Sequence, residues 1–225
     1  AGAVFAPALP PLAAAYRDVV NIDLLSRLVL PLPALAIALA APFAGVLLDR
    51  FGRRTVLLAS LIFYAVAGTT GLYLNDVYLI LGGRFLLGIA VAGCMTAATT
   101  IIGDRFVGDR RVRFLGLQAA SMAAGGVVFV LGGGFLADVH WRAPFAVYGV
   151  AIFVALLGFW SVKESAPRSE TAETGEAAVP WGLVSILSLL GIAGMVLMYL
   201  IPTQLPFRLE QTLSSSGTQV GLAIA

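Results

Sequence analysis

Long apolar runs constrain the fold of this chain more than any other feature. Two of them, at 28–48 and 55–74, have the length of about 20 residues that a helix needs to cross roughly 30 Å of hydrocarbon. Three more follow, at 77–102, 114–137 and 143–162. Only 12% of the 225 residues are charged, whereas soluble domains hold roughly 25%. The runs therefore predict an all-α protein that crosses a membrane several times.

A short charged segment, 45–54, joins the first two runs. Four of its ten residues are charged and three of those are Arg, which places the segment on the cytoplasmic side. Asp49 at the end of a membrane helix needs a cation or a helix N-terminus as its partner, because an unpaired charge there is costly. Gly45 lets another helix approach closely, and Gly52 allows the tight reversal between two spans. The Arg side chains can pair with Asp49 and with lipid phosphates.

The spacing of this segment carries a resemblance. The pattern G-x-x-x-D-R-x-G-R-R resembles the cytoplasmic loop motif between the second and third helices of the major facilitator superfamily of secondary transporters. A positive-inside loop of an unrelated membrane protein would explain the Arg residues but not the spaced glycines and acid. The resemblance implies a latch that locks the outward-facing state. Its matching residues are Gly45, Asp49, Arg50, Gly52, Arg53 and Arg54.

Arg84 is the one cation in the run at 77–102. Arg84 and Gly88 resemble the superfamily's helix 4 motif, which is implicated in proton transfer, although Leu87 stands where Gln is common. Intramembrane ionisable residues usually face a polar cavity, so we expect Arg84 to lie at a substrate or coupling cavity with Gly88 beside it. Snorkelling of Arg84 to the outer surface and simple helix packing at Gly88 are the alternatives.

The run at 114–137 is rich in glycine. The spacing of these glycines resembles the superfamily's antiporter motif G-x8-G-x3-G-P-x2-G-G. Phe129 and Val130 replace the Gly-Pro pair of that motif, which leaves antiport open. We expect the matching positions to serve as packing or hinge glycines. They are Gly116, Gly125, Gly133 and Gly134.

One hydrophilic stretch, 163–180, divides the apolar runs, and its composition predicts a cytoplasmic linker. We expect 1–162 to form an N-terminal six-helix bundle of two inverted three-helix repeats, with helix 1 incomplete. Residues 181–225 would hold helix 7 and the start of helix 8, which makes the chain a fragment truncated at both ends. Tyr199 and Gln204 of helix 7 are substrate-cavity candidates, and an outer-end cap with an interfacial Tyr is the alternative.

The basic residues favour one orientation of the helices. The segment at 103–113 carries four Arg and is expected to be a second, solvated cytoplasmic loop. Its residues 104–106 repeat the Asp-Arg-Phe order of 49–51 without the rest of the motif. The segments at 16–27 and 138–142 are expected to be an external loop and an external turn.

The sequence favours a transporter over other classes of membrane protein. It holds no metalloprotease, intramembrane-protease or P-loop motif, so we expect neither an enzyme nor a cofactor or metal site. By resemblance we expect a monomer in the lipid bilayer of the bacterial inner membrane, an antiporter that exports a small organic solute against protons by alternating access. Uptake of a small metabolite by proton symport and a non-transporting receptor or scaffold on this fold are the alternatives. Nucleic acid is not an expected partner, because the basic residues collect in short loops.

Overall fold

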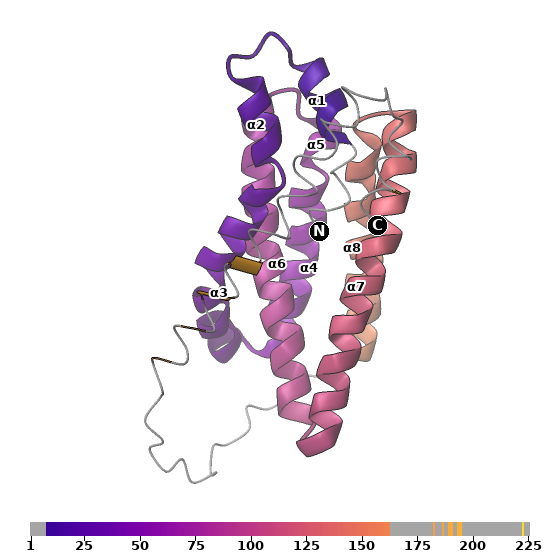
Figure 1. Cartoon of the computed structure of the whole chain (residues 1–225). Coiled ribbons are helices and arrows are strands. Elements are labelled where there is room, and N and C mark those ends of the chain that lie inside the picture. The colour runs from indigo at the N-terminus through magenta and orange to yellow at the C-terminus, as the bar shows by residue number, and fades with distance from the viewer. Residues whose placement is uncertain are drawn as a thin grey trace.

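The computed structural model describes residues 8–162 and seven single positions beyond them, 182, 186, 189, 190, 193, 194 and 222. All regular structure in the described part is helical, and Figure 1 shows the long helices α3, α4, α6 and α7 running along one axis. In chain order the helices are α1 (Leu9–Ala15), α2 (Ile22–Leu28), α3 (Pro31–Phe51), α4 (Arg53–Gly68), α5 (Thr70–Tyr73), α6 (Val77–Arg105), α7 (Gly108–Val139), the 3-10 helix η2 (Ala143–Gly149) and α8 (Val150–Ser161).

The described residues contain five helical stretches that are long and apolar enough to cross a membrane, and these coincide with the five apolar runs. The prediction of an all-α chain with several membrane-spanning helices is therefore confirmed. The stretches are Pro31–Phe51, Arg53–Tyr73, Val77–Arg105, Gly108–Val139 and Ala143–Ser161.

The predicted loop at 103–113 is mostly helix, and that prediction was wrong. α6 continues to Arg105 and α7 begins at Gly108, so a break of only two residues separates them. Arg105 in the last turn of α6 and Asp109 in the first turn of α7 complement the dipoles of their helices. These end charges favour helical structure beyond the apolar run, where hydropathy alone predicts a loop.

The loops predicted at the opposite ends of the helices also differ from the structure. α2 takes up much of the external loop expected at 16–27, and α7 runs on to Val139 inside the turn expected at 138–142. Asp76 ends the preceding turn and begins α6, because its carboxylate accepts hydrogen bonds from the backbone N–H groups of Tyr78 and Leu79.

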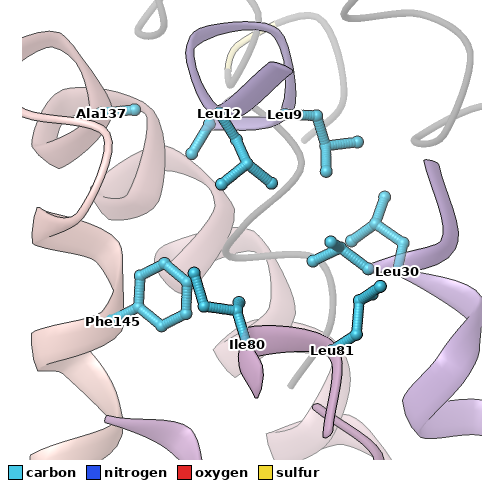
Figure 2. Packing of buried hydrophobic residues seen from close by; sticks show 9 residues of the cluster. Leu9, Leu12, Leu30, Ile80, Leu81, Ala137 and Phe145 are labelled. Atoms are coloured by element: carbon cyan, nitrogen blue, oxygen red, sulfur yellow. The ribbon is translucent and has the colours of Figure 1, made fainter. Parts of the chain in front are cut away.

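An apolar cluster holds these ends together (Figure 2). Leu9 and Leu12 of α1 lie near Ile80 of α6 and Phe145 of η2, and all four side chains are fully buried. The cluster joins elements that are far apart in the sequence. It therefore sets the position of η2 against α6, where Arg84 lies about one helical turn beyond Ile80.

Arg142 ties the same ends together with hydrogen bonds. Its guanidinium donates to the carbonyl oxygens of Gly71, Leu72 and Leu74 at 3.1–3.4 Å and to the Oδ1 of Asn75 at 2.7 Å. The last carbonyls of a helix have no partner within it, so a guanidinium at the end of α5 satisfies them. The turn after α7 is thereby attached to the turn before α6.

α6 packs against both α3 and α4, which contact each other much less. A close approach of α6 to α3 occurs at Gly88, where an added Cβ would lie 2.6 Å from the Cβ of Ala36 and 2.9 Å from the Cα of Pro33. Gly88 thus lies in a helix–helix contact, which is the packing alternative considered from the sequence.

Candidate functional site

The charged segment 45–54 folds as two helix ends joined at one glycine. α3 ends at Phe51 and α4 begins at Arg53, and Gly52 between them has φ +86°. That conformation is readily adopted only by glycine. The reversal brings the C-terminus of α3 and the N-terminus of α4 together and places Arg53 close to Asp49.

Arg53 is the centre of this charged cluster. Its Nε lies 3.0 Å from Oδ2 of Asp104, its Nη2 lies 3.4 Å from Oδ1 of Asp49, and its Nη1 donates to the carbonyl of Leu48 at 3.3 Å. The residue is only 8% exposed. A cation in the first turn of a helix opposes the helix dipole, so these three acceptors compensate an otherwise unfavourable position. Arg53 therefore links the end of α3, the start of α4 and the end of α6.

Asp104 is the functional candidate that the sequence analysis missed. It was assigned to a solvated loop, but it lies in the last turn of α6, and its side chain is 17% exposed, against 76% for that of Asp49. The Asp104 contact is the shorter one, is a hydrogen bond as well as an ion pair and is less screened by water, so Asp104 is the stronger partner of Arg53. The repeated Asp-Arg-Phe order, which ends α3 and nearly ends α6, was the available signal.

The other residues of the motif have separate partners. Arg54 donates to the carbonyl of Phe159 at 2.6 Å, with its guanidinium 4.8 Å from the centre of that ring, and so attaches α4 to α8. The guanidinium of Arg50 lies 5.4 Å from the centre of the Phe51 ring. At Gly45 an added Cβ would meet no atom within 4 Å among the described residues, so the close helix approach expected there is not found in this part of the chain.

Arg84 lies inside the helix packing. It is 1% exposed, its Nη1 donates to the hydroxyl of Tyr148 at 2.9 Å, and its guanidinium lies 4.3 Å from the centre of the Phe145 ring and 5.0 Å from that of Tyr148. The snorkelling alternative would need an exposed guanidinium. Instead η2 encloses it with two aromatic rings, three residues apart, which the sequence analysis did not single out.

The glycines of α7 fall into two groups. Gly133 and Gly134 are buried, whereas Gly116 and Gly125 meet no neighbouring helix among the described residues. Helix packing at the second pair therefore stays a prediction. Tyr199 and Gln204 lie outside the described residues.

Comparisons with known proteins indicate the same family as the motif at 45–54. The family model of the Major Facilitator Superfamily matches residues 1–225. The chain is 36% identical to the tetracycline resistance protein, class C, of Escherichia coli over 165 residues, which are 70% of this chain and 40% of that protein. It is 32% identical to multidrug resistance protein 1 of Bacillus subtilis (strain 168) over 139 residues, 60% of this chain and 35% of that protein. The chain thus spans less than half the length of these relatives.

The fold is similar to that of a solved transporter. The crystal structure of a D-xylose-proton symporter superposes with a TM-score of 0.70 and 16% sequence identity, over 99% of this chain and 61% of that one. At this identity the likeness concerns the fold alone. The resemblance inferred from residues 45–54 is confirmed by the family match over the whole chain, and the chain belongs to the Major Facilitator Superfamily.

Proposed function

We propose that the complete protein is a secondary transporter that exports a small organic solute in exchange for protons by alternating access. The observation that carries this proposal is the Arg53 cluster, which joins the ends of three helices through Asp49 and Asp104. The names of the two relatives, resistance proteins for tetracycline and for multiple drugs, support export of an organic compound.

The cluster is suited to a reversible latch. Its contacts hold the end of α6 against the turn between α3 and α4, and separation of these ends would break the contact of Arg53 with Asp104. Partly exposed ion pairs contribute about 1 kcal/mol or less, and a change of about 1.4 kcal/mol alters a two-state equilibrium tenfold. Such a latch therefore biases two states of similar free energy without trapping either.

Proton symport into the cell is the second candidate. The observation in its favour is the replacement of the Gly-Pro pair of the antiporter motif by Phe129 and Val130 in α7. Both candidates use alternating access and differ in the direction of solute relative to protons.

The test uses the complete protein in liposomes that contain a pH-sensitive dye. Panels of lipophilic cations, drugs and small metabolites are added, and lumenal pH is followed beside liposomes without protein and with the Arg53→Gln variant. Compound-dependent proton flux is expected for the unmodified protein, and its direction relative to labelled solute separates antiport from symport. Binding of a compound without any movement of solute or protons would contradict transport and favour the receptor alternative.

Tyr148 offers a test of the buried Arg84. Tyr148→Phe keeps the ring beside the guanidinium but removes the hydroxyl that accepts from Nη1. Loss of a hydrogen bond to a charged group costs about 1.5–3 kcal/mol, so we expect a melting temperature several degrees lower in detergent and a reduced transport rate. Tyr78→Phe is the control for the loss of one tyrosine hydroxyl, because Tyr78 lies at an exposed position near the start of α6. Equal behaviour of the two variants would contradict a role of the Tyr148 hydroxyl in holding Arg84.

A further inference from the structure

An apolar groove of about 650 Å³ lies between α3 and α4, with α6 at its base. Its walls include Leu39 and Phe43 of α3 and Phe63 of α4, which are exposed. Its base includes Ala90 and Gly93 of α6, which are buried. Small side chains on all three helices, among them Ala40, Ala59 and Gly93, leave room between the larger ones, and the exposed walls leave the groove open to the outside.

The groove is long in the direction of the helices. On α3 its lining extends from Ala36 to Phe51, which corresponds to about 22 Å at 1.5 Å per residue. The hydrocarbon core of a bilayer is roughly 30 Å thick, so a groove that begins at one face passes the middle. An apolar slot of this length in a membrane suits an extended acyl chain.

One end of the groove lies beside a cation. Phe51 and Thr55 line this end, and the guanidinium of Arg50 lies over the Phe51 ring. Among the described residues, Arg53 pairs with Asp49 and Asp104, whereas no carboxylate lies within ion-pair distance of Arg50. Arg50 is thus an exposed cation at the mouth of the groove, at the level where lipid phosphates are found.

We propose that the groove binds one acyl chain of an anionic phospholipid of the adjacent leaflet, with the lipid phosphate held by Arg50. The apolar walls explain why an acyl chain enters, and the exposed guanidinium explains the preference for an anionic headgroup. Occupation of the groove does not require transport, so lipid binding can be tested independently of the proposed function.

The test is photo-crosslinking of the complete protein in liposomes, with a photoactivatable group in the acyl chain of phosphatidylglycerol or of phosphatidylcholine. Crosslinked residues are located by peptide mass spectrometry. We expect labelling of the groove residues with about fivefold preference for phosphatidylglycerol, the ratio expected for one basic residue at the membrane surface. Unlabelled phosphatidylglycerol is expected to compete for this labelling in the unmodified protein, and phosphatidylcholine is not.

Two pairs of variants separate the parts of the site. Arg50→Gln is expected to remove the headgroup preference, whereas Arg54→Gln, the same change at an arginine that faces Phe159, keeps it. Ala59→Phe is expected to fill the groove and abolish its labelling, whereas Ala38→Phe, at an exposed position of α3 outside the lining, leaves it intact. Three results would each overturn the proposal. They are equal labelling by both lipids, unchanged labelling in Ala59→Phe, and a groove that no lipid labels because another part of the protein covers it.

Discussion

Arg53→Gln is expected to lower the initial rate of transport by about tenfold or more in the complete protein, while insertion into the membrane is retained. The substitution keeps a polar side chain of similar length but removes the charge that joins Asp49, Asp104 and the carbonyl of Leu48. The carboxylate of Asp104, 17% exposed, is left without this cation, which disfavours the state in which the helix ends meet. An unpaired and poorly solvated charge costs more than the intact pair contributes, and about 1.4 kcal/mol in that state is enough for a tenfold effect.

The two acids are expected to differ in effect. Asp104→Asn should impair transport nearly as much as Arg53→Gln, because it removes the more buried partner at 3.0 Å. Asp49→Asn should have the smaller effect, because its carboxylate is 76% exposed and lies 3.4 Å from Arg53. The sequence pattern alone points to Asp49 as the acid of the latch, so this order depends on the tertiary structure.

A double-mutant cycle measures the coupling. Initial rates are compared for Arg53→Gln, Asp104→Asn and the double variant, with Arg110→Gln as a control for the loss of one exposed cation on the same side. Because the two residues are in contact, the double variant should be little worse than either single variant. Strictly additive losses, or normal transport by Arg53→Gln, would contradict the latch.

Gly88→Ala is expected to destabilise the fold itself. The new methyl group would lie 2.6 Å from the Cβ of Ala36 and 2.9 Å from the Cα of Pro33, and closer still to the carbonyl oxygen of Pro33. Two of these atoms belong to the backbone of α3, so the helices must move apart. Overpacking of this kind costs about 1–3 kcal/mol, and loss of close packing along α3 and α6 would add to it.

Gly82→Ala is the matched control on the same helix, because an added Cβ there meets no atom within 4 Å among the described residues. Replacing Gly by Ala in a helix interior favours the helix by about 1 kcal/mol when there is room. In detergent, thermal unfolding followed by size-exclusion chromatography should show a lower melting temperature for Gly88→Ala and an equal or higher one for Gly82→Ala. A Gly88→Ala variant as stable as the Gly82→Ala variant would contradict the close contact.

The sequence by itself determined the class of fold and the position of the spans. Apolar runs such as 28–48 and 55–74 predict membrane helices because the bilayer requires both a minimum length and internal hydrogen bonding of every backbone group. The motif at 45–54 identified the superfamily, and Gly52 was correctly expected to make the reversal. These features depend on neighbouring residues, whose spacing can be counted along the chain.

The tertiary structure alone decided which distant side chains meet. Arg53 and Asp104 are 51 residues apart, and Arg84 and Tyr148 are 64 apart. Their contacts depend on the rotation and the depth of whole helices, which are set by close packing at residues such as Gly88 and not by local hydropathy. The apolar groove beside Arg50 likewise has no signature in the sequence. It forms between three helices, and only their packing decides which of their surfaces face one another.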